Sequence, residues 1–280
     1  MKSGNYRKVV SSVISYAFLS AGAALYIIPL FWMISTSLKI DSQLFKIPPV
    51  WIPNPIVWSN YYKAVTLFPF LQYLSNTLFL CVMNIAGSVI SSCIVAYGLS
   101  HIKWPGREAV FLLVLATMML AYQVRMIPLY ITFNKFGLTG SFLALWIQSF
   151  LGLSAFFIFL LRQFFLTIPN DLSDAAKLDG CSEVGILWRI VLPLSKPAIF
   201  TVVLFEFLWT WNDFLNPLIY LNDSSKFTLS LGLKFFQGMR SAQWALLMAA
   251  SSLITIPIII LFFFTQRTFI QGITLTGLKG

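Results

Sequence analysis

The sequence predicts an all-α, polytopic membrane protein with six transmembrane helices. Hydrophobic residues make up 58% of its 280 residues and charged residues only 10%, whereas a soluble domain is roughly half apolar and about a quarter charged. Six stretches are apolar over about the 20 residues that a bilayer span needs. Together these observations exclude an ordinary soluble domain.

The six apolar stretches are separated by polar connections, of which the one after the first stretch and the one after the fourth are long. They cover residues 9–38, 74–99, 109–124, 141–160, 199–221 and 246–264. The first exceeds the apolar region of a signal peptide, about 7–15 residues, so we expect it to be retained. Prolines, Trp51 and Trp58 fill the connection 39–63, which predicts an ordered, non-helical loop at a membrane interface.

The distribution of lysine and arginine predicts the orientation. If both termini are placed in the cytoplasm, the cytoplasmic segments carry more lysine and arginine than the outer ones, as membrane proteins usually do. We therefore expect both termini to be cytoplasmic. The net charge of +10 then fits lipid headgroups as partners. No basic stripe with interleaved aromatic residues is present, so we expect no nucleic-acid binding.

Cofactor and nucleotide sites are not expected in this chain. Its three cysteines lack C-x-x-C spacing and it has a single histidine, so no metal cluster is predicted. Nothing matches the G-x-x-x-x-G-K-[ST] phosphate-binding loop. We therefore predict no cofactor and no catalytic residue.

The connection between the fourth and fifth spans is unusually polar. Charged side chains gather there, at Arg162, Asp171, Asp174, Lys177, Asp179, Glu183, Arg189 and Lys196. Pro169 breaks the chain, Asn170 or Asp171 can cap a helix over residues 172–178, and Gly180 suits the position after its end. Ser182 can cap a second helix that stops near Pro193. By pattern alone, the first helix could dock on a partner or rest on lipid headgroups.

The segment "IPNDLSDAAKLDGCSEVGILWRIVLPLSKPAI" resembles the EAA motif of permease subunits in binding-protein-dependent ABC importers. The motif positions are Asp174, Ala175, Ala176, Gly180, Ile190, Leu192 and Pro193. Asp174 departs from the usual glutamate by one methylene. The segments "IPLFWMISTSLK", "WNDFLNPLIYL", "TLSLGLKFFQG" and "GLKG" resemble the carbohydrate-uptake branch, on the side of the six-span maltose-type subunit.

This resemblance implies a type I importer transmembrane domain in a bacterial plasma membrane. The implied division is a first helix with an outer loop (1–70), a transmembrane domain (71–267) with a coupling loop (169–197), and a cytoplasmic tail (268–280). The implied partners are a second homologous permease, two cytoplasmic ATPases and an extracytoplasmic sugar-binding protein. The residues implied to couple to the ATPase are Asp174, Ala175, Ala176, Lys177, Leu178, Asp179, Gly180 and Glu183.

The fifth span carries polar groups at membrane depth, where they usually face a bundle interior or a cavity. They are Glu206, Asn212, Asp213 and Asn216, with Trp209 nearby. Glu206 and Asp213 are expected to share one helical face, and Pro217 is expected to break the helix. Aromatic rings beside amides and carboxylates suit a sugar, so these residues are candidates for the translocation path. A polar stripe bonded to a neighbouring span or a partner permease is the alternative.

The sequence therefore predicts the permease subunit of an ATP-driven sugar importer, with hydrolysis on another chain. Two alternatives stay open. An ion-coupled secondary transporter would use Glu206 and Asp213 as a proton relay. An importer of the same kind could instead carry a polyol or glycerol phosphate.

Overall fold

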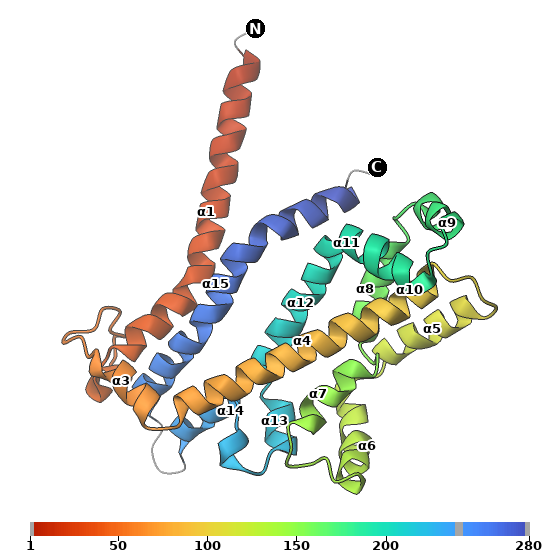
Figure 1. Cartoon of the computed structure of the whole chain (residues 1–280). Coiled ribbons are helices and arrows are strands. Elements are labelled where there is room, and N and C mark those ends of the chain that lie inside the picture. Colours follow the sequence, from red (N-terminus) through yellow and green to blue (C-terminus); the bar gives the residue numbers. More distant parts are fainter. Residues whose placement is uncertain (1–2, 239–242, 278–280) are drawn as a thin grey trace. The chain divides into compact units, whose positions relative to one another are not determined.

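A computed structural model describes the backbone of residues 3–238 and 243–277, and the side chains of residues 12–238 and 243–265 (Figure 1). Every regular element in these ranges is helical, which confirms the all-α prediction. The chain forms two compact units. The first comprises Met1–Pro69 and Leu233–Pro257, and the second Phe70–Gly232 and Ile258–Gly280.

The described helices include four that are individually long and apolar enough to cross a membrane. They cover Ser12–Ser37, Phe70–Ser100, Leu143–Phe165 and Trp244–Thr265. Two further pairs qualify only when both members are counted together: Arg107–Met118 with Tyr122–Lys135, bent by 98°, and Glu183–Leu194 with Lys196–Trp211, bent by 80°. The described residues thus hold four candidate spans, or six if each bent pair counts as one. The bend of the first pair lies within the third predicted stretch, whereas the bend of the second lies just before the fifth, at residue 195.

The first unit places an ordered loop between two helices. It contains α1 (Ser3–Ser37), α2 (Asp41–Leu44), α3 (Ser59–Thr66), the 3-10 turn η3 (Leu233–Gln237) and the first part of α15 (Trp244–Gly277). The Lys39 ammonium lies 3.8 Å from the centroid of the Trp32 ring, and the Asn60 amide donates to the carbonyls of Ser37 and Lys39 at 2.9 and 3.0 Å. These contacts show that the loop is ordered, as predicted. The prediction that it is non-helical is wrong in part, because α2 and the start of α3 lie within residues 39–63.

The second unit is built around the long helix α4 (Phe70–Ser100), which packs against α7, α8 and α12 (Figure 1). The helices that follow α4 are α5 (Arg107–Met118), α6 (Tyr122–Lys135), α7 (Leu143–Phe150), α8 (Ala155–Phe165), α9 (Asn170–Leu178), α10 (Glu183–Ile186), the π-helical η1 (Leu187–Val191), α11 (Leu192–Leu194), α12 (Lys196–Trp211), α13 (Leu215–Tyr220), η2 (Ser224–Lys226) and α14 (Leu229–Gly232). A core cluster joins the C-terminal half of α4 to α8, α10, η1 and α12.

Helices α4 and α7 approach closely because glycine and serine line their contact. A Cβ added at Gly87 would lie 2.5 Å from Cδ2 of Phe150. Beside it, Ser91 Oγ donates to the carbonyl of Ser149 at 2.6 Å, and Ser149 Oγ donates to Oδ1 of Asn84 at 2.7 Å. Small residues of this kind let membrane helices pack backbone to backbone.

Replacing Gly87 with leucine is expected to prevent this packing and to lower the amount of folded protein in membranes severalfold. Overpacking of a tight contact costs about 1–3 kcal/mol, and more where the neighbour cannot move. Gly98→Ala, in the same helix, is the matched control because nothing lies within 4 Å of its added Cβ. The yield and melting temperature of the detergent-solubilised protein are measured for both variants. Equal behaviour of Gly87→Leu and Gly98→Ala would contradict the prediction.

The predicted division into 1–70, 71–267 and 268–280 stays a prediction. Helix α15 continues to Gly277, so much of the predicted tail is helical. Residues 278–280 lie outside the described residues.

Candidate functional site

The polar connector folds as α9 followed by a sharp turn. Gly180 has a φ of 78°, a conformation that favours glycine because it has no Cβ. The amide of Gly180 donates to the carbonyl of Lys177 at 3.0 Å, and the amide of Cys181 donates to that of Ala176 at 2.9 Å. This pair of bonds is the Schellman motif. The prediction that Gly180 ends the helix is confirmed.

The start of α9 differs from the prediction. Pro169 occupies the N-cap position and no side chain caps the helix, so the expected cap at Asn170 or Asp171 is wrong. Proline suits this place because it fixes its own φ and needs no amide partner. Asp171 lies in the first turn instead, where its carboxylate complements the helix dipole.

Helix α9 has one buried and one exposed face. Ser173 is buried and Ala176 packs against the core cluster of the second unit. The exposed residues of the helix and its C-cap are Asn170, Asp171, Leu172, Asp174, Ala175, Lys177, Leu178 and Asp179, and all but Asn170 and Lys177 lie on one face. Helical geometry puts Ala175 near the centre of this exposed face, and Leu178 is 89% exposed. The two central alanines therefore have different surroundings.

The second helix of the connector begins as predicted. Ser182 is the N-cap of α10, and its side chain accepts a bond of 3.2 Å from the amide of Gly185. The helical run then continues through η1 and α11 to Leu194. Ile186 and Val191 are fully buried in the core cluster. The connector is thus anchored on its C-terminal side.

Glu183 joins the connector to α4. One carboxylate oxygen, Oε1, lies 2.7 Å from Lys177 Nζ of α9. The other, Oε2, accepts a bond of 2.6 Å from the hydroxyl of Tyr97, in the last turn of α4. The Tyr97 ring stacks on His101 with a centroid distance of 5.2 Å. Sequence reasoning missed Tyr97, because a tyrosine near the end of an apolar span has no local pattern that reveals a distant partner.

The charge states of this group follow from their surroundings. The hydrogen bond to Glu183 raises the pKa of Lys177, so Lys177 is a cation at neutral pH. Burial lowers the pKa of His101, so its imidazole is neutral there. The ion pair between Lys177 and Glu183 is partly exposed and contributes little stability by itself.

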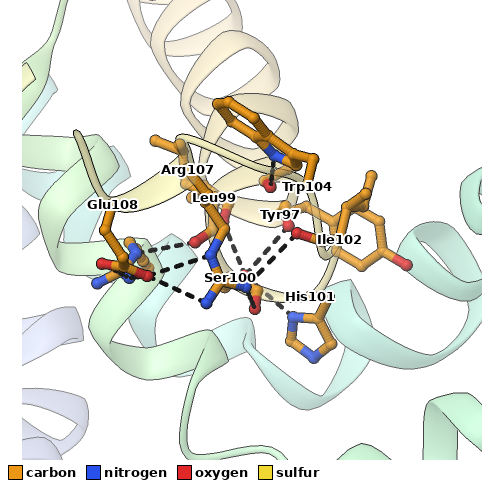
Figure 2. A network of polar contacts seen from close by, with 11 residues as sticks. Tyr97, Leu99, Ser100, His101, Ile102, Trp104, Arg107 and Glu108 are labelled. Atoms are coloured by element: carbon orange, nitrogen blue, oxygen red, sulfur yellow. Dashed lines mark hydrogen bonds and ion pairs between the residues drawn. The ribbon is translucent and has the colours of Figure 1, made fainter. Parts of the chain in front are cut away.

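A second polar network holds the same end of α4 (Figure 2). Arg162 of α8 is buried, donates to the carbonyl of Leu99 at 2.9 Å and contacts both carboxylate oxygens of Glu108 at 2.8 Å. Arg107 donates to the carbonyl of Ser100 at 3.0 Å. Two guanidinium groups thus satisfy carbonyls that a helix end leaves unpaired. This network fixes the start of α5 to the end of α4.

The polar residues of the fifth predicted span do not form one stripe. Helix α12 ends at Trp211, so the prediction that Glu206 and Asp213 share one helical face is wrong. Glu206 is buried, with an oxygen 3.4 Å from the hydroxyl of Thr210. Pro217 lies in the first turn of α13, where a missing amide is tolerated. The break therefore comes before Pro217 and not at it.

Trp209 and Asn212 are the exposed members of the set. Trp209 is 51% exposed, and its ring stacks on Phe157 with centroids 5.0 Å apart. Phe156 and Phe205 lie against the same ring. Asn212 is exposed and its amide donates to the carbonyl of Leu208 at 2.8 Å. Trp209 and Asn212 are three residues apart at the end of α12, a spacing at which side chains are neighbours on a helix surface.

Asp213 and Asn216 bind each other across the start of α13. Asp213 Oδ1 accepts from the backbone amide of Asn216 at 3.1 Å, and Oδ2 accepts from its side-chain amide at 2.8 Å. The hydroxyl of Tyr122 donates to Oδ1 of Asn216, and Ser230 Oγ donates to the Asp213 carbonyl at 2.5 Å. These bonds define the break between α12 and α13 and tie it to α6. Within residues 12–238 and 243–265, no group of three or more His, Cys, Asp or Glu side chains could hold a metal ion.

Comparison with known families gives one match over most of the chain. The profile described as "Binding-protein-dependent transport system inner membrane component" matches residues 88–275. This range contains the connector, the broken fifth span and α15 up to residue 275.

Individual relatives are similar over nearly their whole length. The chain is 35% identical to the arabinooligosaccharides transport system permease protein AraQ of Bacillus subtilis, covering 91% of this chain and 92% of the relative. It is 30% identical to the sn-glycerol-3-phosphate transport system permease protein UgpE of Yersinia pestis, covering 93% and 95%. Its fold matches a chain of a bacterial ABC transporter involved in the import of the acidic polysaccharide alginate, with a TM-score of 0.79, 24% identity and coverage of 95% and 98%.

Proposed function

Because the chain belongs to the binding-protein-dependent transport system inner membrane components, we propose that it forms half of the translocation path of an ATP-driven sugar importer. As a multi-pass inner-membrane permease it is not itself an enzyme. Its implied complex holds a second homologous permease, two cytoplasmic ATPases and an extracytoplasmic sugar-binding protein. Family membership lends no support to the ion-coupled alternative.

A sugar is the favoured substrate class. AraQ, among the most similar relatives, is a permease for arabinooligosaccharides. The exposed Trp209 beside Asn212 supports the same reading, since a sugar offers apolar C–H faces and hydroxyl groups to such a pair. UgpE, at 30% identity, is named for sn-glycerol 3-phosphate, so this anion is the second substrate class to test.

The path residues have two roles in this proposal. Trp209 and Asn212 contact the solute. Asp213 and Asn216 fix the geometry of the break between α12 and α13. Glu206 is buried within α12. Both termini lie in the cytoplasm, as the distribution of lysine and arginine indicates.

The exposed face of α9 is the proposed ATPase contact, and its geometry is the observation that carries the coupling role. Small Ala175 near its centre permits close approach. The prominent Leu178 can fill a pocket, and Asp174 and Asp179 can fix the register with cations of the partner. Gly180 permits the turn that follows, and Ala176, Lys177 and Glu183 hold the helix from behind.

A crosslink joined to an uptake assay tests this function. Leu178→Cys, in a background without Cys81, Cys93 and Cys181, is expected to crosslink to a copurified P-loop ATPase with a yield that changes with ATP. Ala176→Cys is the matched control, because Ala176 packs against the core and is expected to crosslink poorly. In proteoliposomes, the loaded binding protein and ATP should drive uptake of an arabino-oligosaccharide in preference to sn-glycerol 3-phosphate.

Three outcomes would contradict parts of the proposal. Uptake that needs an ion gradient and no ATP would overturn the importer. ATP-driven uptake of glycerol phosphate alone would overturn the sugar. An ATP-independent crosslink from both positions would overturn the docking face.

A further inference from the structure

Both oxygens of the Glu183 carboxylate are engaged within the chain. One pairs with Lys177 of α9 and the other accepts the hydroxyl of Tyr97 of α4, at 2.7 and 2.6 Å. Glu183 is the first residue of α10. Its carboxylate thus connects α10 to both α9 and α4. A role in ATPase contact alone would not require both carboxylate oxygens to bind groups of this chain.

Tyr97 is the firmest point of the connection. Its side chain belongs to the core cluster and is only 4% exposed. A hydroxyl bonded to a carboxylate at 2.6 Å is a charge-assisted hydrogen bond, the stronger kind. The stacked His101 ring, itself edge-on to Phe165 with centroids 6.3 Å apart, keeps Tyr97 in place. The acceptor is therefore held by a rigid donor.

A displacement of α9 can reach α4 through Lys177, Glu183 and Tyr97. On its buried face, α9 contacts the core through Ala176, which is too small to interlock strongly. Lys177 and Glu183 supply the directional contact, and Tyr97 receives it. Helix α4 then packs along α12, α7 and α8, so movement of its end reaches the helix that carries Glu206 and Trp209. A packed interior transmits such a shift rather than absorbing it.

We propose that Tyr97 and Glu183 are positioning residues that transmit movement of α9 to α4 and so couple ATP hydrolysis to transport. This inference rests on the function proposed above and adds to it. Neither residue contacts the solute or the nucleotide in this mechanism. Glu183 acts by holding Tyr97, and Tyr97 acts by moving α4.

The test compares Tyr97→Phe with Lys177→Met in the complete transporter in proteoliposomes. Tyr97→Phe removes one hydroxyl and keeps the ring, so the core is preserved. It is expected to lower uptake of the arabino-oligosaccharide about tenfold, because it removes the hydrogen bond that joins Glu183 to α4. ATP hydrolysis stimulated by the loaded binding protein should stay within about twofold. Lys177→Met breaks the same route at its partly exposed ion pair, so it should lower uptake in the same direction as Tyr97→Phe but by less, with stimulated hydrolysis again within about twofold.

A double-mutant cycle adds the second variant. Glu183→Gln should lower uptake as Tyr97→Phe does, and the combined variant should be no worse than either alone, since residues that act through one bond are not additive. Glu183→Asp, which keeps the charge on a shorter side chain, should recover part of the uptake.

The overturning results are distinct from failure of the proposed function. If uptake and stimulated hydrolysis fall in the same proportion, the bond is merely structural. If Tyr97→Phe leaves uptake unchanged, the link does not transmit movement. A parent complex without ATP-driven uptake would instead refute the importer itself.

Discussion

Replacing Ala175 with arginine is expected to abolish ATP-driven uptake while leaving the permease at its normal level in the membrane. Ala175 lies exposed near the centre of the outer face of α9, so a long side chain there does not disturb the core. It does prevent close approach of a partner, and a blocked interface centre costs far more than a blocked rim. Uptake should fall at least about a hundredfold, which corresponds to about 2.8 kcal/mol of lost docking.

The matched control is Ala175→Ser, which keeps the profile of α9 and should retain most of the uptake. Copurification of the ATPase measures docking directly, and the melting temperature of the permease measures its fold. Full uptake by Ala175→Arg would move the ATPase contact away from α9. Loss of the permease from the membrane would show that this face is covered within the permease itself.

Replacing Asp213 with alanine is expected to lower uptake about tenfold or more. The substitution removes both acceptors of Asn216 and leaves a backbone amide unpaired, at a cost of about 1–3 kcal/mol. The break between α12 and α13 should then lose its fixed geometry, and Trp209 and Asn212 should lose their fixed positions. Uptake rate and its apparent KM for the loaded binding protein measure the effect.

Asp213→Asn separates positioning from contact with the solute. Its amide oxygen can still accept the backbone bond of Asn216, so it should retain more uptake than Asp213→Ala. Tyr122→Phe loses only the bond to Asn216, so its uptake rate should lie between those of the parent and Asp213→Ala. Equal and complete loss in Asp213→Asn and Asp213→Ala would instead place the Asp213 charge in the translocation path.

Local patterns predicted much of the connector correctly. Gly180 was identifiable because a left-handed residue after a helix favours glycine, and Ser182 because a hydroxyl caps the amides of the next turn. The N-cap of α9 was not identifiable in the same way. Pro169, Asn170 and Asp171 all suit a helix start, so the local pattern does not select among them.

The fifth span is the clearest case in which the sequence misled. Residues 199–221 are predominantly apolar, so hydropathy indicates one span with Glu206 and Asp213 on one face. The break falls after Trp211, where Tyr122, Ser230 and Asn216 hold Asp213 and its neighbours. Tyr122 and Ser230 come from elements that are distant in sequence, and hydropathy carries no information about them.

By itself, the sequence determined that this protein is helical, crosses the membrane and carries a polar connector that resembles the EAA motif. Those properties depend on apolar length and on residues within one or two turns of each other. Only the tertiary structure decided which alanine of α9 is exposed, where the third and fifth spans bend, and that Glu183 binds Tyr97. Each of these depends on which side chains meet after the helices pack, and residues 86 positions apart leave no mark of that meeting on their local sequence.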